Sequence, residues 1–278
     1  MKKFLIVANS KKDENLIIAK QVQQYINLHG GNGEICVDAY DIPENCDVDC
    51  AVVLGGDGTM LLASYKLAGR GIPMIGINLG TVGFMAEVDP CNMEQAMDCL
   101  LNDAYRIEER MNLVGTIYHQ GEEMMTSIAL NDIVVSRSGY SRIICLRIYV
   151  NGELLDVYEA DGVIVATPTG STAYNLSAGG PIVSPNTSLI LVTPVSPHSL
   201  TSKSVVLSGE DEIEVEIVPK RKSQKEEANA TFDSRTYEEL QPGDRIRIRR
   251  SPTKTKLVKI YPNSFYEILR SKMGESNR

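Results

Sequence analysis

Apolar and polar positions follow two different patterns along this chain, and the change between them comes near residue 106. Before it, short apolar runs typical of buried strands alternate with segments of helical periodicity. The strand-like runs are 4–8, 34–37, 51–54 and 72–78, and the helix-like segments are 15–28 and 59–68. Asp89-Pro90 begins a further helix, because a capping residue precedes a proline at the first helical position. Alternating β and α segments predict an open α/β domain with a parallel sheet.

After residue 106, apolar residues recur at every second position, as they do in half-buried strands. The segment 144–150 is one such strand, Asn151-Gly152 is a tight hairpin turn, and 154–158 is the returning strand. We therefore expect an α/β domain over 1–105 and a mainly β domain over 106–261. Ser264 and Glu267 have capping-box spacing, so a helix over 262–278 should follow and could pack back on the first domain.

Charge and composition narrow the class of protein. The 278 residues carry a formal net charge of -8, which argues against nucleic-acid binding through bulk electrostatics. The apolar run 4–8 is too short for a signal peptide, and no long apolar segment predicts a membrane span. The six cysteines lack metal-ligand or dithiol spacing, so reduced thiols are expected. These features predict a soluble cytoplasmic protein without a nucleic-acid or membrane partner.

The first candidate site is the glycine turn Gly55-Gly56-Asp57-Gly58-Thr59, between a buried strand and a helix. Such turns lie at the carboxyl edge of a parallel sheet, where open α/β folds bind ligands. Small residues and free amides at a helix start attract phosphate, so Gly55, Gly56, Gly58 and Thr59 are candidate phosphate ligands. The turn lacks the spacing and lysine of a P-loop. From these residues alone, a plain turn with a solvated aspartate is an equally good interpretation.

The second candidate is the segment 161–181, in which an apolar strand leads into Thr167-Pro168-Thr169-Gly170-Ser171-Thr172-Ala173-Tyr174. Hydroxyls and amides can bind a sugar or phosphate, and a tyrosine offers a flat apolar wall. The alternative, a cluster of Ser/Thr turns, explains this mixture less well. Between the two candidates, Asn131-Asp132 places an amide beside a carboxylate at a strand edge, which by itself is ordinary turn chemistry.

Together these three motifs resemble the NAD kinase family, over most of the chain after Ala51. The Gly-Gly-Asp-Gly turn is shared with diacylglycerol-kinase-like and phosphofructokinase-like proteins, whereas the long 161–181 segment is more specific. The resemblance implies an NAD kinase/diacylglycerol kinase-like fold. It also implies an enzyme that moves the terminal phosphate of ATP onto the adenosine-ribose 2′-hydroxyl of NAD, giving NADP.

The resemblance also implies roles for individual residues. Asp57 matches the family's catalytic base, and Gly58 matches a neighbouring residue that contacts NAD. Asn131 and Asp132 match the residues that hold the adenosine half of NAD in the family. Asp161 matches an acidic residue that contacts the nicotinamide side. Arg142 stands where a basic residue is common near NAD. The loop that wraps the dinucleotide corresponds to Thr169, Thr172, Ala173, Tyr174, Asn175, Leu176 and Ser177.

Three departures from the family pattern bear on the site. Glu159 replaces a basic residue, which would lose or invert one contact to the dinucleotide. Arg235, in Asp233-Ser234-Arg235, stands where many members have glutamine, so the last NAD contact is altered. No lysine clamp for ATP is recognisable, which increases the expected importance of Mg²⁺ or another divalent cation held by the nucleotide. His198, in a Ser/Pro segment, is assigned a structural role.

Two other functions remain open at this point. A kinase of a lipid or sugar would keep the glycine turn, although it would not require the 161–181 loop. A non-catalytic dinucleotide sensor would keep the loop, although it would not require Asp57. The sequence leaves open ATP or polyphosphate as donor and NAD or NADH as acceptor. By analogy with the family, we expect a homodimer or homotetramer.

Overall fold

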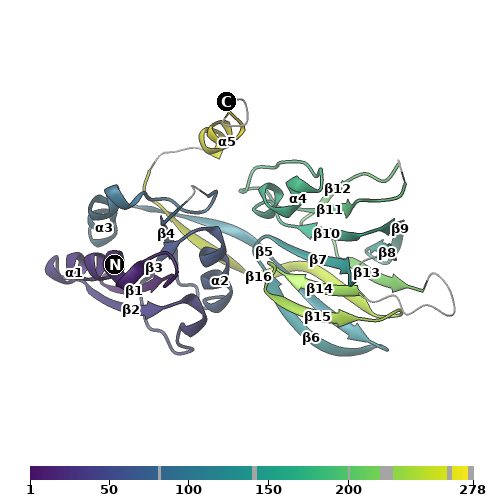
Figure 1. The fold of residues 1–278 in the computed structure, drawn as a ribbon, viewed down its shortest axis with the longest axis horizontal. Coiled ribbons are helices and arrows are strands. Elements are labelled where there is room, and N and C mark those ends of the chain that lie inside the picture. The colour runs from purple at the N-terminus through teal and green to yellow at the C-terminus, as the bar shows by residue number, and fades with distance from the viewer. Residues whose placement is uncertain (81–82, 140–142, 200, 220–227, 262–264, 275–278) are drawn as a thin grey trace. The chain divides into compact units, whose positions relative to one another are not determined.

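The chain divides into two compact units (Figure 1). The computed structural model describes residues 1–80, 83–139, 143–199, 201–219, 228–261 and 265–274. One unit consists of Met1–Arg110 and Lys254–Arg278, and the other of Met111–Thr253. Strands β5 (Arg106–His119) and β16 (Arg245–Lys259) each contain one of the boundaries. The first unit therefore takes its last residues from the C-terminal part of the chain.

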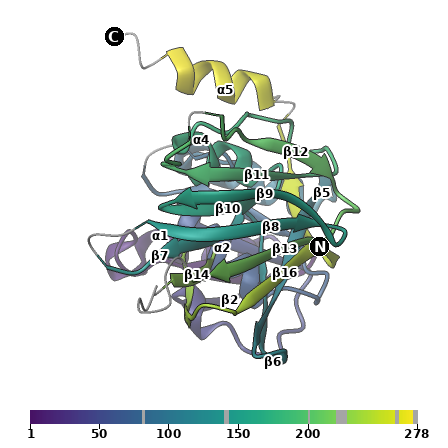
Figure 2. The same cartoon turned by 90° about the vertical axis from the view of Figure 1, so that its right-hand side faces the viewer.

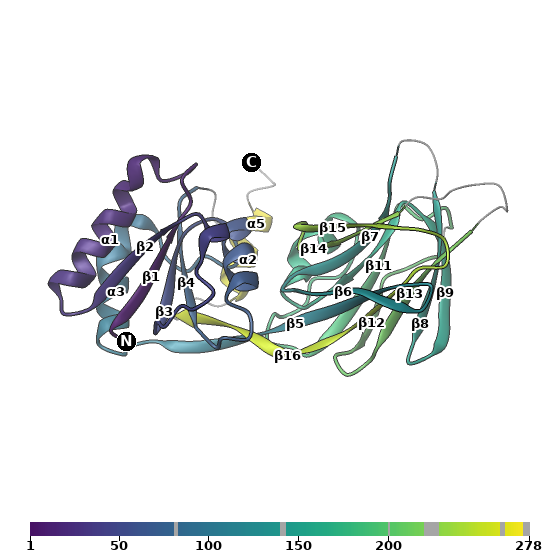
Figure 3. The same cartoon turned by 90° about the horizontal axis from the view of Figure 1, so that it is seen from below.

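The first unit is an α/β domain with a parallel sheet, as the sequence predicts. Its strands lie in the order β2, β1, β3 and β4, and Leu257 of β16 pairs in parallel with Met74 of β4. Helices α1 and α3 cover one face of the sheet and α2 covers the other (Figure 3). The element bounds are β1 (Lys3–Ala8), β2 (Asn32–Val37), β3 (Cys50–Gly55), β4 (Met74–Asn78), α1 (Ile17–Leu28), α2 (Asp57–Lys66), α3 (Met93–Leu101) and α5 (Phe265–Gly274).

Strand β3 forms the centre of this unit because all of its residues are buried. Its side chains alternate between the two covered faces, which is why the sequence shows an apolar run and not an apolar/polar alternation. The helix expected over 15–28 begins only at Ile17, since Asn15 and Leu16 have positive φ angles of 57° and 56°. The helix expected over 59–68 begins two residues earlier, at Asp57.

The second unit is mainly β, also as predicted. One antiparallel sheet has the order β12-β11-β10-β7-β14-β15, and Figure 2 shows β7, β10 and β11 running side by side. Strands β16, β13, β8 and β9 pair antiparallel in a second group. The bounds are β6 (Glu122–Ala129), β7 (Asp132–Arg137), β8 (Ile144–Val150), β9 (Glu153–Ala160), β10 (Gly162–Ala166), β11 (Leu189–Val195), β12 (Val205–Ser208), β13 (Ile213–Val218), β14 (Ala228–Phe232) and β15 (Thr236–Leu240).

The predicted hairpin between β8 and β9 is confirmed. Asn151 and Gly152 both have positive φ, at 51° and 84°, as a type I′ turn requires. The period-two pattern is confirmed as well, since Ile213, Val215 and Ile217 are fully buried while their neighbours are partly exposed. Side chains from both groups of strands form one apolar core in this unit.

The unit boundaries differ from the predicted domains 1–105 and 106–261. The first boundary falls after Arg110, and the residues from Lys254 onward belong to the first unit. The reason is that β5 and β16 are long continuous strands, so no turn marks the point where each passes from one unit to the other. Helix α5 also belongs to the first unit. Among the described residues, no helix is both long and apolar enough to span a membrane.

Candidate functional site

The glycine turn ends β3 and begins α2, so its amides lie at the start of a helix. Gly56 is the N-cap residue of α2 and Asp57 is its first residue. A side chain at Gly55 would overlap that of Thr59, so only glycine fits there. The Thr59 hydroxyl accepts a hydrogen bond from Asn9 Nδ2 at 3.0 Å, which ties the turn to the end of β1. The turn is thus fixed by its neighbours.

The Asp57 carboxylate is held by the backbone of the segment after β4. Its Oδ2 accepts the Phe84 N–H at 2.9 Å and its Oδ1 accepts the Met85 N–H at 3.2 Å. A Cβ at Gly83 would overlap the carboxylate, so this close approach needs glycine. Asp57 is half-buried. Its orientation is therefore set by the fold before any ligand binds.

A pocket of about 430 Å³ opens beside this carboxylate, and two lysines line it. The Lys12 ammonium lies 2.9 Å from where a Cβ of Gly56 would be and 3.3 Å from that of Gly80. Lys272, from α5, is the other cation. Within the described part of the chain, neither lysine forms an ion pair. The full lining is Asn9, Lys12, Gly56, Asp57, Gly58, Thr59, Gly83 and Lys272.

Sequence reasoning missed both lysines. Lys12 lies in the loop after β1 and Lys272 lies in the last helix, so neither has a fixed spacing from the glycine turn. The only sequence signal is Lys11-Lys12 immediately after a buried strand, at the sheet edge that carries the turn. The structure thus supplies the positive charge that the sequence left unassigned.

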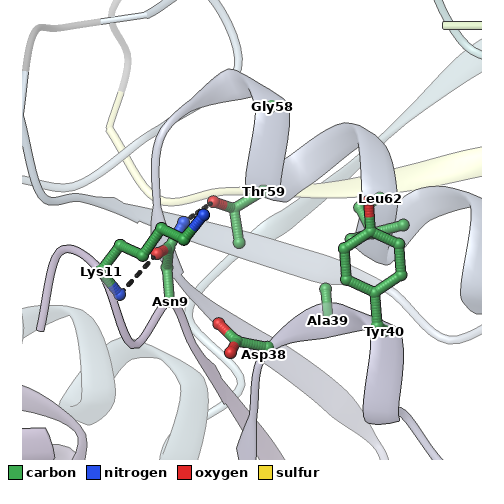
Figure 4. Close-up of a pocket in the computed structure, with 8 residues that line it drawn as sticks. All are labelled: Asn9, Lys11, Asp38, Ala39, Tyr40, Gly58, Thr59 and Leu62. Carbon is green, nitrogen blue, oxygen red and sulfur yellow. Dashed lines mark hydrogen bonds between the residues drawn. The ribbon is translucent and has the colours of Figure 1, made fainter. Parts of the chain in front are cut away.

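A second pocket, of about 440 Å³, shares Asn9, Gly58 and Thr59 with the first (Figure 4). The Tyr40 ring and Leu62 lie together at one side of it, whereas Asn9 and Lys11 lie at the other. Tyr40 is 68% exposed, so its ring is accessible to a ligand. This pocket therefore has an apolar side with a flat ring, and a polar side adjoining the glycine turn.

In the second unit, three strand ends gather most of the predicted residues. Asp132 begins β7, pairs with Ala166 at the end of β10, and lies beside the end of β14. The buried Asp233 carboxylate accepts the N–H groups of Leu130, Asn131 and Asp132 at 2.8, 2.7 and 3.2 Å. Arg235 Nη2 donates to the same carboxylate at 3.2 Å and to the Ile128 carbonyl at 3.1 Å. Asp233, which sequence reasoning did not assign, holds this group together.

Two carboxyl groups are buried together here. Asp132 is 4% exposed and its side chain has no hydrogen-bond partner among the described residues. Burial, with the nearby Asp233 charge, raises the pKa of Asp132 to about 7. Burial also raises the pKa of Asp233, although the three amides and Arg235 oppose this by favouring its charged form. Asp132 is therefore the member of the pair that more readily holds a proton.

The hydroxyl-rich loop after β10 uses several of its polar groups to fix its own shape. Thr167 Oγ1 donates to the Leu130 carbonyl at 2.6 Å, and Ser171 Oγ donates to the Pro168 carbonyl at 2.7 Å. Asn175 is fully buried; its Nδ2 donates to two carbonyls of the loop and its Oδ1 accepts from Thr193 Oγ1 at 2.7 Å. Asn175, predicted to contact NAD, thus has its hydrogen bonds filled by the fold.

The remaining predicted loop residues differ in exposure. Tyr174 is 46% exposed and Leu176 is 41% exposed. Ser177 is exposed as well, Thr172 and Ala173 are half-buried, and Thr169 is buried. The surface that this loop presents to a ligand therefore consists mainly of residues 172–174, 176 and 177.

Asp161 lies at the opposite end of β10 from this group. It precedes Gly162, whereas Asp132 pairs with Ala166, so a strand length of about 17 Å separates the two acids. Arg137 Nε donates to Asp161 Oδ1 at 2.6 Å, a pairing that the sequence reading did not assign. Glu159, which stands where the family commonly has a basic residue, is exposed on β9. Arg142 lies outside the described residues.

No cluster of three or more His, Cys, Asp or Glu side chains that could hold a metal ion occurs in the described ranges. Asp57 is the one carboxylate that lines the pocket with the lysines. Any cation there would need most of its oxygen ligands from another source, and phosphate oxygens are suitable ones.

Comparison with known proteins gives a consistent result. The family model for the ATP-NAD kinase N-terminal domain matches residues 39–105, and that for the C-terminal domain matches residues 130–260. The chain is 44% identical to an NAD kinase of Lachnoclostridium phytofermentans, covering 99% of this chain and 100% of that protein. It is 45% identical to an NAD kinase of Agathobacter rectalis, covering 99% of both.

Two solved structures are similar in fold. An NAD kinase from Archaeoglobus fulgidus in complex with ATP has a TM-score of 0.79 and 26% identity, covering 97% of this chain and 98% of that one. Yeast NADH kinase complexed with NADH has a TM-score of 0.90, covering 99% of this chain and 88% of that one. Its identity of 24% supports likeness of fold alone.

Proposed function

Because the chain belongs to the NAD kinase family and is an NAD kinase, we propose that Asp57 is its catalytic base. The observation that carries this proposal is the Asp57 carboxylate, fixed by the Phe84 and Met85 amides at the glycine turn that begins α2. Each carboxylate oxygen keeps a lone pair for a second hydrogen bond. Asp57 can therefore orient a hydroxyl and accept its proton.

The reaction follows from that position. The adenosine-ribose 2′-oxygen of NAD attacks the terminal phosphorus of the donor, the bond from that phosphorus to its bridging oxygen breaks, and the shortened donor leaves. The 2′-hydroxyl proton passes to Asp57, which prevents positive charge from building up on the attacking oxygen. The products are NADP and, when the donor is ATP, ADP.

The donor phosphates would bind in the pocket beside Asp57. Gly56, Gly58 and Thr59 provide small residues and helix-start amides there, and Gly55, which we also propose as a phosphate contact, precedes them at the end of β3. Lys12 provides a cation without an ion-pair partner in the described ranges. The donor's nucleoside half would lie in the adjoining pocket, against Tyr40 and Leu62. Such a site favours ATP over polyphosphate, which has no base to stack on the ring.

For the acceptor we propose Asp57 and Gly58 as contacts in the first unit, and the residues below as contacts in the second unit. Asn131 and Asp132 would hold the adenosine half, and Asp161 the nicotinamide side. The separation of about 17 Å along β10 suits the two ends of an extended dinucleotide. The further contacts we propose are Thr169, Thr172, Ala173, Tyr174, Leu176, Ser177 and Arg235, while Asn175 supports the loop from beneath.

A divalent cation such as Mg²⁺ fits this pocket if the nucleotide brings most of its ligands. Asp57 lines the pocket and could contribute a carboxylate oxygen. When bound, the cation would offset the negative charge of the donor phosphates during transfer. The protein's own part is to bind the phosphates with Lys12 and to keep Asp57 oriented toward the ribose.

The cellular location and the oligomeric state of the enzyme are also proposals. The absence of a membrane-spanning helix in the described part of the chain is compatible with a cytoplasmic protein. The exposed Leu154 and Val157 on β9 favour self-association through the second unit, as a homodimer or homotetramer. Light scattering of the purified protein across a range of concentrations measures this directly.

The test of the proposed function is a coupled assay for NADP. Purified protein given NAD, ATP and Mg²⁺ should form NADP in proportion to enzyme. Binding of NAD without NADP formation would instead favour a dinucleotide sensor. NADH and polyphosphate, substituted one at a time, establish the acceptor and donor preferences.

One variant sharpens the assignment of the donor pocket. Leu62→Trp fills the space beside Tyr40, so the rate with ATP should fall while any rate with polyphosphate should not. An equal fall with both donors would contradict a nucleoside pocket at this position.

A further inference from the structure

The last helix of the chain, α5, contributes a cation to the pocket of Asp57. Lys272 lines that pocket together with Lys12 and the glycine turn. Phe265 and Lys272 are seven residues apart, close to two helical turns, so they lie on the same face of α5. Helix α5 belongs to the same compact unit as the glycine turn.

This face of α5 packs against Phe84. The Phe265 and Phe84 rings have centroids 6.3 Å apart at an angle of 42°, and the Lys272 ammonium lies 5.5 Å from the Phe84 ring centroid. These are the distances of an aromatic pair and of a cation–π contact. The Phe84 N–H is also the group that donates to Asp57 Oδ2. One residue therefore contacts both the last helix and the catalytic carboxylate.

The charges around the pocket indicate a role for Lys272 in binding an anion. Within the described ranges, Lys272 forms no ion pair, although the chain as a whole has a net charge of -8 and many acids are available. Lys12 approaches the same pocket from the loop after β1. Two ammonium groups beside helix-start amides form a site for a polyanion, and an inorganic or nucleoside triphosphate has the matching chemistry.

We propose that Lys272 is a donor-binding residue, whose ammonium binds a phosphate of the donor, and that Phe265 docks α5 on Phe84 to place it there. This inference rests on the proposed function, because it assigns the donor to that pocket. It makes the C-terminal helix part of the donor site, although that helix is far in sequence from the glycine turn at residues 55–59.

Steady-state kinetics of a small set of α5 variants test this. Lys272→Ala should raise the KM for ATP by at least about tenfold, with a smaller change in kcat and an unchanged KM for NAD. Lys272→Arg should keep most of the affinity for ATP. Arg270→Ala is the matched control, because it removes one positive charge from an exposed position on the same helix. Equal kinetics for Lys272→Ala and Arg270→Ala would overturn the inference.

Calorimetry with inorganic triphosphate, in the presence of Mg²⁺ and without NAD, separates binding from turnover. The wild-type protein and Arg270→Ala should bind it similarly, and Lys272→Ala should bind at least about tenfold more weakly. Phe265→Ala should weaken binding too, and thermal melts should show that each variant is folded. Unchanged binding in Lys272→Ala and Phe265→Ala would refute the inference. If the wild type formed no NADP, the proposed function would fail, whereas selective loss of triphosphate binding would still support Lys272 as a phosphate ligand.

Discussion

The glycine turn before α2 and the hydroxyl-rich loop after β10 both follow a buried strand, yet they are built in different ways. The loop fixes much of its own shape, because Ser171 and Asn175 donate to its own carbonyls and Thr167 donates to the Leu130 carbonyl just before β7. The glycine turn contributes little beyond backbone and one carboxylate. Its pocket is completed by Lys12, by the segment around Gly83 and by Lys272.

The two regions therefore differ in which side chains stabilise the fold and which remain available to bind a ligand. In the loop, the buried polar groups maintain the fold, and the exposed ones remain for a ligand. In the pocket of the glycine turn, Lys12 and Lys272 do little for the fold, because neither has an ion-pair partner in the described ranges. Substitutions in the loop should therefore change stability first, and those in the pocket should change activity first.

The largest expected effect on stability is at Asn175 in the loop. Asn175→Ala removes hydrogen bonds to Ser171, Pro181 and Thr193 and leaves their partners buried, so the free energy of unfolding should fall by about 3 kcal/mol. Urea unfolding measures this. Ser177→Ala, at an exposed position of the same loop, is the control and should change stability by less than about 0.5 kcal/mol. Similar stabilities for the two variants would contradict the distinction between framework and contact residues.

A smaller effect, about 2.5 kcal/mol between pH 5 and pH 8, is expected from the pH dependence of Asp132. Its pKa of about 7 in the folded protein lies above the usual value, so the folded state keeps a proton that the unfolded state has already released. Stability should therefore fall as pH rises from near 4 to near 7, and this loss should be complete above that range.

Asp132→Asn should remove that part of the pH dependence. Urea unfolding at pH 5 and pH 8 compares the wild type with this variant, and Asp156→Asn, at an exposed position, serves as the control. An unaltered pH dependence in Asp132→Asn would mean that another group carries the buried proton.

The smallest of these effects concerns Lys12. Lys12→Ala should raise the KM for ATP about tenfold, which corresponds to about 1.4 kcal/mol, and leave the free energy of unfolding nearly unchanged. Lys20→Ala, on the exposed face of α1, is the matched control for charge. A loss of stability in Lys12→Ala without a change in KM would place this lysine with the framework and not with the donor site.

Sequence patterns predicted the parts of the fold that depend on local periodicity. Strand β3, the hairpin turn at Asn151-Gly152 and the alternation along β13 were all recognisable, because burial alone dictates those patterns. The ends of the units were not, since β16 remains one strand through a boundary even though Ser251-Pro252, a pair common in turns, lies beside it. Periodicity describes one element at a time, and so it does not show where a strand changes partners.

The candidate site was predictable only where it is contiguous in sequence. Asp57 and its glycine turn form one motif, which a single strand-to-helix junction positions. Lys12, Asp233 and Lys272 reach their places through tertiary packing, and lysines and aspartates are too common on surfaces to stand out. Asn175 makes a different point, because its sequence pattern does not show that this polar side chain, within a predicted binding motif, is bonded inside the fold.

If Asp57 takes the proton from the ribose hydroxyl, single-turnover NADP formation should depend strongly on its carboxylate. With NAD binding confirmed by calorimetry, Asp57→Asn should form NADP at a rate lower than that of the wild type by about 10²–10⁴-fold. A variant that binds NAD and forms NADP at close to the wild-type rate would contradict it.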